Sequence, residues 1–243
     1  MQFSCTTRAS AVVCLAVCVF AGTAHAAQPD AIVVGFLGGF VGRTNPAHVE
    51  VQLAGRLRTA YPAGLQVRTF ENHRGQQALQ EVLRLLDSNH DGALSAEEKS
   101  AARIAIYGHS WGASETVNLA RELDRRQIPV LLTVQVDSVE KRGENDASIP
   151  SNVVSAVNFF QLDGMLHGRA KIYAADPSRT QILGNFQSHY KNKPVNCAGY
   201  HWYARLFMKA HIEIESDPAV WNRVEALIRS KLMLAPPPGQ PAG

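Results

Sequence analysis

The sequence predicts an α/β fold with three layers, in which helices cover both faces of a mostly parallel sheet. Apolar runs rich in β-branched residues, such as 31–37, alternate along the chain with stretches of helical periodicity, such as 76–86. The 243 residues are 46% hydrophobic and 19% charged, which suits one globular domain with a sizeable core. Strands that alternate with helices are joined by crossovers, so we expect them to lie parallel in one sheet.

The individual elements follow from these patterns. Strands are expected at 31–37, 65–70, 103–107, 129–136 and 153–160. Helices are expected to begin at Asn45-Pro46, where a capping side chain precedes a proline, and to cover 76–86, 113–126 and 217–232. Active sites of such sheets gather at the carboxyl ends of the strands, so the residues that follow each strand are the candidates for function.

The first 26 residues have the three parts of a signal peptide. Arg8 is the positive residue, 11–20 is an apolar run, and Ala24 and Ala26 are the small residues before the cleavage point. A membrane-spanning helix needs roughly 20 apolar residues, so this run is too short to remain as an anchor. We expect an exported protein, periplasmic or secreted, with the domain at 27–234 and a loose tail at 235–243.

Cysteine and charge content limit the remaining functions. Cys197 is the one cysteine left after cleavage at this point, so the mature chain has no internal disulfide. The 24 basic and 21 acidic residues are nearly balanced and scattered, which does not favour a nucleic acid partner. Nothing in the motifs indicates an organic cofactor or a later membrane span.

Residues 108–112, GHSWG, follow the Gly-x-Ser-x-Gly pattern between an expected strand and an expected helix. A turn that lifts a serine above a sheet is sharp and leaves no room for side chains on either flank, which explains the two glycines. Ser110 is therefore a candidate nucleophile. The alternative is an ordinary serine in a glycine-rich turn.

On this motif and on the order of its elements, the chain resembles the α/β-hydrolase superfamily of serine esterases and lipases. The resemblance implies a nucleophile, an acid and a histidine in that chain order. It also implies an oxyanion hole, formed here by the backbone N–H of Trp111 and by a second N–H near Gly39 or Phe40, in the loop after the first strand.

A serine needs a base, and four histidines follow Ser110 in the chain: His167, His189, His201 and His211. His211 is favoured because it stands just before the last helix, where a loop leaving the final strand would deliver it. His201, among aromatic residues, is the second choice. His109 precedes the nucleophile and is expected to form a wall of the site.

The acid that orients the base should be a carboxylate at a strand end between Ser110 and His211. Asp137 directly follows the apolar run 130–136 and is the preferred candidate. Asp163, one strand later, and Asp176 are the alternatives. Asp137 has a structural interpretation as well, in which it caps the loop that follows.

A second motif lies at 87–98, where the sequence DSNHDGALSAEE matches the calcium-binding loop of an EF-hand. The ligand positions hold Asp87, Asn89, Asp91, Ala93 through its carbonyl, Ser95 through water, and Glu98 as the bidentate ligand. The outgoing helix is short and no second loop is present to pair with, so we expect weak, structural binding of Ca²⁺. Because the loop precedes the strand that leads to Ser110, calcium is expected to rigidify that approach.

Two functions follow from these motifs. The first is an exported serine hydrolase that cleaves small-molecule or lipid carboxylic esters through Ser110, His211 and Asp137. The second is a non-catalytic, exported calcium-binding protein on a hydrolase-like scaffold, since fold alone does not determine function.

Overall fold

The structure is a computed structural model that describes residues 1, 30–197, 200 and 202–234. The predicted signal peptide beyond Met1 and the predicted tail at 235–243 lie outside the described residues. No helix in the described part is long and apolar enough to cross a membrane.

A six-stranded, wholly parallel sheet forms the centre of the molecule, with the strand order β2-β1-β3-β4-β6-β8. Its strands are β1 (Ala31–Leu37), β2 (Leu65–Glu71), β3 (Ile104–His109), β4 (Val130–Val136), β6 (Val153–Gln161) and β8 (Gln181–Ser188). A small parallel pair, β5 (Ser148–Ile149) with β7 (Tyr173–Ala174), lies outside it. The α/β architecture with a parallel sheet is as predicted.

The edge strand β8 was not predicted. It is only half-buried and carries Gly184 at its middle, and both features weaken the β-branched, apolar signal by which strands are recognised. Gly184 has φ +154°, and the register with β6 shifts between Ala156 and Val157. The strand forms because its backbone pairs with the free edge of β6, a long-range contact that the local sequence does not show.

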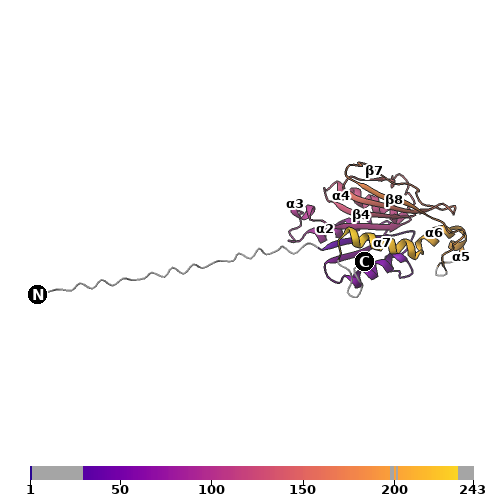
Figure 1. The fold of residues 1–243 in the computed structure, drawn as a ribbon, viewed down its shortest axis with the longest axis horizontal. Helices are drawn as coiled ribbons and strands as arrows, with labels where there is room; N and C mark the ends of the chain where they lie inside the picture. Colours follow the sequence, from indigo (N-terminus) through magenta and orange to yellow (C-terminus); the bar gives the residue numbers. More distant parts are fainter. Residues whose placement is uncertain (2–29, 198–199, 201, 235–243) are drawn as a thin grey trace.

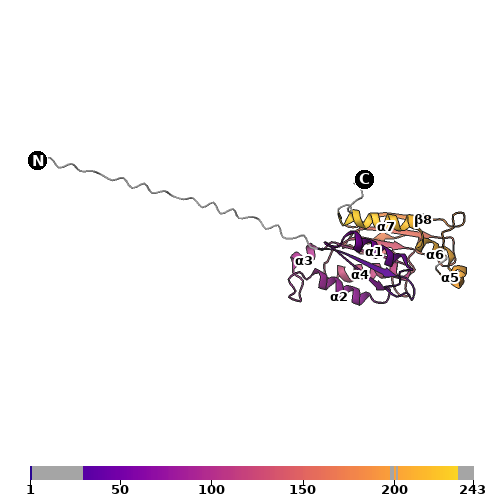
Figure 2. The same cartoon turned by 90° about the horizontal axis from the view of Figure 1, so that it is seen from below.

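Helices cover both faces of the sheet, with α1 (Val49–Ala60), α6 (Lys209–Glu215) and α7 (Pro218–Lys231) on one face and α2 (Gly75–Leu86) and α4 (Trp111–Asp124) on the other (Figure 2). The alternation of side chains along β1 divides the core accordingly. Ala31 and Val33 face α1 and α7, whereas Ile32 and Val34 face α2 and α4. The predicted three layers are therefore present.

Helix starts follow the predicted chemistry in one case and depart from it in another. The side chain of Asp217 accepts a hydrogen bond of 2.8 Å from the N–H of Ala219, as an N-cap should. Asn45 does not start α1: its side chain accepts from the N–H of Ala47 at 3.1 Å and closes a turn, and the helix begins at Val49.

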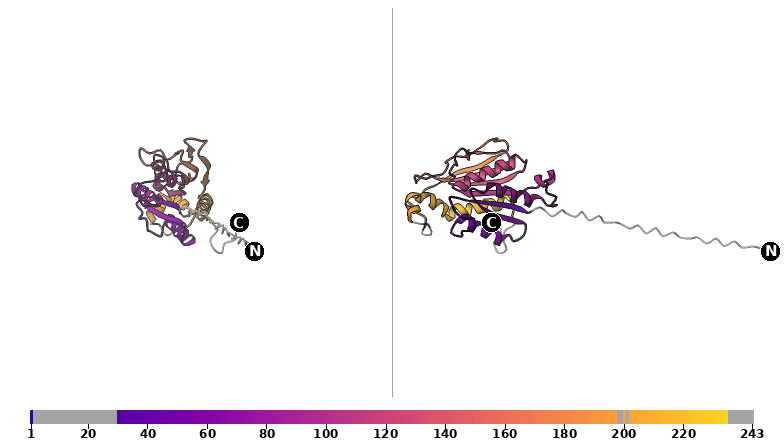
Figure 3. Two further views of the ribbon diagram at one scale, coloured as in Figure 1. Left: turned by 90° about the vertical axis from the view of Figure 1, so that its left-hand side faces the viewer. Right: turned by 180° about the vertical axis from the view of Figure 1, so that it is seen from behind.

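The two ends of the sheet carry different parts of the chain (Figures 1 and 3). The short helices α5 (Trp202–Phe207) and α6 lie at one end, and α3 (Ala96–Ser100) lies at the other. The 87–98 loop and α3 come just before β3, and Ser110 comes just after it. The loop and Ser110 are therefore separated by the length of that strand, about 20 Å at ~3.3 Å per residue. The expectation that calcium would act on the approach to Ser110 finds no support in this placement.

We expect Trp221→Ala to destabilise the fold by about 3–5 kcal/mol, because Trp221 is 1% exposed and packs edge-on against Tyr107, with ring centroids 6.2 Å apart. Urea unfolding measures the loss. The control is Phe207→Ala: Phe207 is 64% exposed, and its removal should cost less than about 1 kcal/mol. Equal losses in the two variants would contradict the assigned core.

Candidate active site

Ser110 stands in a strained turn between β3 and α4. Its backbone has φ 58° and ψ −127°, a conformation that non-glycine residues rarely adopt. A Cβ on Gly108 would lie 2.4 Å from the carbonyl oxygen of Gly112, and a Cβ on Gly112 would lie 2.3 Å from that of Phe36. Both glycines of the motif are therefore required by close backbone contact.

The turn is tied to the end of the neighbouring strand. The N–H of Ser110 donates to the carbonyl of Val136 at 3.0 Å, and the carbonyl of Ser110 accepts from the N–H of Val139 at 3.2 Å. Asp137 and Ser138 lie between Val136 and Val139, so the loop after β4 starts directly beside the serine. Ser110 itself is 8% exposed.

His211 and Asp137 are joined by a hydrogen bond of 2.7 Å between Nδ1 and Oδ2, although 74 residues separate them. Asp137 is completely buried. Its carboxylate also accepts from the backbone N–H and side-chain amide of Gln161, at 3.1 and 2.8 Å, and from the N–H of Gly168 at 2.7 Å. Four donors hold this carboxylate in one orientation, as a buried acceptor requires.

Gly168 and Gln161 were not identified from the sequence. A Cβ on Gly168 would lie 2.4 Å from Cα of Asp137, so only glycine allows its N–H to come this close. Asp137 has φ 45°, the left-handed region, which turns its side chain back over the end of the sheet. No local pattern marks either residue, because both act on Asp137 across the sheet edge.

His211 lies within α6, not in a loop leaving the last strand as expected. Ala210 and Ile214 of this helix pack on the α1/α7 side of the core, which gives the segment a helical period that the sequence analysis overlooked. The ring of His211 lies against that of His109, with centroids 4.5 Å apart. His109 is thus beside the site, where it was expected.

The alternative residues are placed elsewhere. His201 lies outside the described residues. His189 is 69% exposed on its side chain, with Nδ1 3.9 Å from Oδ1 of Asp163, whose Oδ2 accepts from the N–H of Tyr190 at 2.6 Å. His167 contacts the carbonyl of Gly168 at 3.2 Å, and Asp176 accepts from Ser178. Among the described residues, the structure brings Asp137 alone of the three acids to His211.

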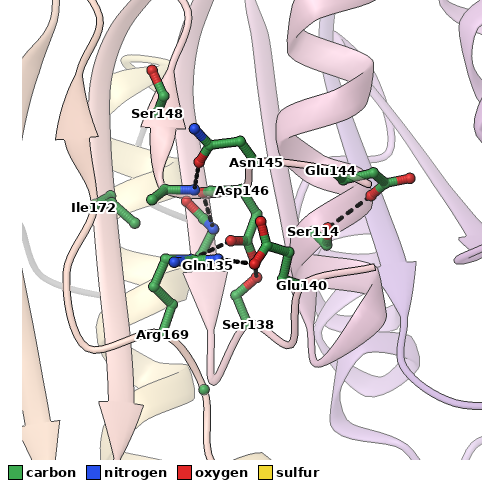
Figure 4. Close-up of polar contacts among 12 residues, drawn as sticks. Ser114, Gln135, Ser138, Glu140, Glu144, Asn145, Asp146, Ser148, Arg169 and Ile172 are labelled. Atoms are coloured by element: carbon green, nitrogen blue, oxygen red, sulfur yellow. Dashed lines mark hydrogen bonds and ion pairs between the residues drawn. The ribbon is translucent and has the colours of Figure 1, made fainter. Parts of the chain in front are cut away.

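A polar network fixes the loop that follows Asp137 (Figure 4). The hydroxyl of Ser138 donates to Asp146 at 2.5 Å, and Arg169 pairs with both Asp146 and Glu140. The N–H of Arg169 also donates to the carbonyl of Ser138 at 2.8 Å. Asp137 and Gly168 are the neighbours in sequence of Ser138 and Arg169, so the network holds the donor beside its acceptor.

The loop after β1 lies against the serine turn. A Cβ on Gly38 would lie 2.9 Å from Cβ of Ser110, and Gly39 has φ +54°. The ring of Phe40, 95% exposed, meets that of Trp111 edge-on at 5.6 Å. The N–H of Trp111 is in the first turn of α4, where no carbonyl of the helix can accept it. Of the three expected oxyanion-hole residues, Trp111 follows Ser110 directly, and Gly39 and Phe40 follow Gly38, which contacts Ser110.

A second acidic group is buried behind His109, and no sequence motif indicates it. Nδ1 of His109 lies 3.4 Å from Oε2 of Glu215 and 3.8 Å from Oε1 of Glu50, while Nδ1 of His48 lies 2.6 Å from Oε1 of Glu215. Burial, and then the charge of Glu215, raises the pKa of Glu50 well above its usual value. Burial also acts to raise the pKa of Glu215, but His109 and His48 outweigh it and hold this pKa at about 2.

The 87–98 loop is a turn held by hydrogen bonds from its own backbone to its own side chains. Gly92 has φ +83°, Asp87 accepts from the N–H of Gly92 at 3.0 Å, and Asp91 accepts from that of Ala93 at 2.8 Å. The backbone N–H of Ser95 holds Glu98 and, with Ser88, lowers its pKa to about 2. Asn89 accepts from the N–H of Asp91 at 3.0 Å. All six candidate ligands thus follow one another around a single exposed turn.

Comparisons with known proteins found similar folds only. No family model matches the chain, and no curated protein does. Solved structures similar to it include a cutinase-like protein from Cryptococcus sp., at 13% identity, a TM-score of 0.45, and coverage of 85% of this chain and 96% of that one. Human thioesterase 2 matches at 10%, with a TM-score of 0.42 and coverage of 84% and 96%. An acetyl xylan esterase matches at 12%, with a TM-score of 0.41 and coverage of 84% and 99%.

Gln161→Glu should destabilise the protein at neutral pH by about 2–4 kcal/mol, because it replaces a donor on Asp137 by a second buried carboxylate. The new carboxyl has its pKa raised in the folded state, so the loss should appear above about pH 4.3, the usual pKa of glutamate, and shrink below it. Urea unfolding across pH measures this. Gln187→Glu, at an exposed position of β8, is the control and should show no such dependence. A Gln161→Glu variant as stable as wild type at pH 7 would contradict the assigned contact.

Proposed function

We propose that this protein is a serine hydrolase that cleaves carboxylic esters through a covalent acyl-enzyme. The observation that carries the proposal is the coincidence at one sheet edge of the strained Ser110 turn and the buried His211–Asp137 hydrogen bond. The chain passes outward from β1 to β2 and then returns to β3 on the other side of β1, so both Ser110 and the loop after β1 lie at a topological switch point. Ligands of doubly wound sheets bind at this point.

The proposal gives each member of the triad one role, and the hydrogen bond between His211 and Asp137 supports two of them. When Nδ1 of His211 donates its proton to Asp137, Nε2 keeps its lone pair and is able to take the proton of the Ser110 hydroxyl. Oγ of Ser110 then attacks the ester carbonyl. Asp137 keeps the imidazole in this tautomer and stabilises its positive form. His211 returns the proton to the leaving alcohol, and water later releases the acid by the reverse route.

The developing oxyanion is assigned to backbone donors. The N–H of Trp111, free of intrahelical bonding, is one, and an N–H of Gly39 or Phe40 is the other. The edge-on pair of Phe40 and Trp111 forms an apolar surface next to Ser110, which suits an apolar acyl or alkyl group. We propose carboxylic esters as the substrate class and an exported protein, periplasmic or secreted.

Calcium binding at the 87–98 loop belongs to the same proposal as a stabilising feature. The turn geometry and the ligand set support it. The loop lies before β3 and Ser110 lies after it, at the opposite end of the strand. Calcium binding should therefore affect the stability of the protein and not the chemical step. A non-catalytic calcium-binding protein is the competing function, and loss of activity at Ser110 distinguishes the two.

Ser110→Ala should lower kcat for p-nitrophenyl ester hydrolysis by about 10⁴–10⁶, because the nucleophile is removed while the fold stays intact. Assays with p-nitrophenyl esters of different acyl lengths measure kcat and identify the acyl length that the enzyme prefers. Ser178→Ala, at an exposed turn, is the matched control and should keep full activity. Equal hydrolysis by the Ser110 variant and wild type, or none by either, would contradict the proposal.

Asp137→Asn should lower kcat by about 10³–10⁴, because an amide that donates to Nδ1 forces the wrong tautomer on His211. Asp163→Asn changes the alternative acid and should leave kcat within about 3-fold of wild type, since Asp163 bonds Tyr190 and not His211. A large loss in Asp163→Asn with little loss in Asp137→Asn would reverse the assignment of the acid.

Calcium should raise the melting temperature, and chelator should lower it, with kcat at 25 °C unchanged within about 2-fold. Glu98→Gln removes the bidentate ligand and should abolish the shift. Differential scanning fluorimetry and the ester assay are run on the same samples. If calcium leaves the melting temperature of wild type unchanged, the loop is an acidic turn without a metal.

A further inference from the structure

A second group of side chains lies next to the triad, and the proposed chemistry does not use it. His48 directly precedes α1, Glu50 lies in the first turn of that helix, and Glu215 is the last residue of α6. One donor atom from each of the three lies within 4.8 Å of the others. The two carboxylates therefore meet one imidazole where the start of α1 faces the end of α6.

Glu50 is the unexplained member of this group. Its side chain is 0% exposed, and among the described residues neither carboxylate oxygen has a hydrogen bond, since Nδ1 of His109 stays 3.8 Å from Oε1. The hydroxyl of Tyr107 lies close by but donates to the backbone carbonyl of Glu50, at 2.7 Å. Buried carboxylates are normally hydrogen-bonded or bound to a metal, so two oxygens without a hydrogen bond indicate that a ligand completes this position.

The charges of the group also favour a cation. Within the described part of the chain, the ion-pair partners of Glu50 and Glu215 are the histidines His48 and His109. His109 lies 3.8 Å from Glu50 and 3.4 Å from Glu215, and so contacts the carboxylates from the side of the triad. A divalent ion between the two carboxylates would balance their charge.

We propose that His48, Glu50 and Glu215 bind a divalent first-row transition metal ion, for which Zn²⁺ is the reference. One imidazole nitrogen and two carboxylate oxygens suit zinc, manganese, iron or cobalt, whereas calcium takes oxygen ligands only. Ligand atoms around an ion at about 2.1 Å are about 3.4 Å apart, so the 2.6 Å hydrogen bond from His48 to Glu215 gives way to two metal bonds. His48 is 13% exposed on its side chain and leaves a path of entry.

The site joins two segments that matter for the proposed catalysis. Glu215 stands four residues after His211 in α6, so both side chains lie on the same face of that helix. An ion held by Glu215 and by the start of α1 would fix the helix that carries His211. This consequence rests on the proposed function, but binding of the ion does not.

The test is direct metal binding to the mature protein after treatment with chelator. Isothermal titration with Zn²⁺, plasma mass spectrometry after desalting, and the visible absorption of Co²⁺ report affinity, stoichiometry and ligand environment. We expect one Zn²⁺ per chain, a higher melting temperature, and no displacement by millimolar Ca²⁺. Uptake of no zinc by wild type would overturn the proposal and would indicate that Glu50 and Glu215 share a proton.

Variants assign the ion to this site. Glu50→Gln and His48→Asn should each weaken Zn²⁺ binding by at least about 100-fold, more than the ~10-fold to 100-fold lost with an outer-sphere partner. Glu98→Gln and Ser110→Ala should bind as wild type does, which separates this ion from the calcium loop and from the fate of the proposed catalysis. Near-ultraviolet circular dichroism shows that each variant folds. Folded Glu50→Gln that binds zinc like wild type, or loss of zinc in Glu98→Gln, would overturn the assignment.

Discussion

The hydrogen bond between His211 and Asp137 is the contact on which the arrangement of the site depends. It joins the helix α6 to the end of β4 across 74 residues of sequence, and it forms only if a buried carboxylate is held at the sheet edge. Burying a carboxylate costs free energy of folding unless its oxygens accept hydrogen bonds. Gln161 and Gly168 donate the remaining hydrogen bonds, and the network of Ser138, Asp146 and Arg169 keeps them in place.

The position of His211 is set by the helix α6, which carries it. Ala210 and Ile214 pack into the core on the α1/α7 side, so the helix is held through apolar contacts while His211 bonds Asp137. Behind His211 come His109 and the buried pair of Glu50 and Glu215. Burial lowers the pKa of His109 to about 4, although Glu215 acts in the opposite direction, so a neutral ring lies against His211 at neutral pH.

Local sequence predicted those parts of the site that depend on local geometry. The Gly-x-Ser-x-Gly turn is such a part, because the steric need for Gly108 and Gly112 arises within and beside the turn itself. Asp137 was the preferred acid because it follows an apolar strand directly, and in the structure it bonds His211. The 87–98 loop is held by hydrogen bonds between its own side chains and backbone, so its turn could also be predicted from local sequence.

Features created by packing were not predictable. Gln161 and Gly168 matter only because β6 and its following loop pass over Asp137, and nothing in their neighbourhood in the sequence marks them. His48 and Glu50 lie near the beginning of the domain sequence and Glu215 near its end, so only folding brings the three together. The strand β8 has a half-polar sequence with a central glycine and depends on pairing with β6. His211, the favoured histidine, does bond Asp137, but its segment was expected to be a loop and is a helix.

The most direct test of the account is to label the mature protein with a fluorophosphonate and map the modified peptide by mass spectrometry. The account predicts one phosphonyl group per chain, located on Ser110, because only a serine activated by His211 attacks phosphorus at an appreciable rate. The folded His211→Ala protein should label slower by at least 10³-fold. Absence of labelling in wild type, or labelling at another residue, would contradict the assignment of Ser110 as the nucleophile.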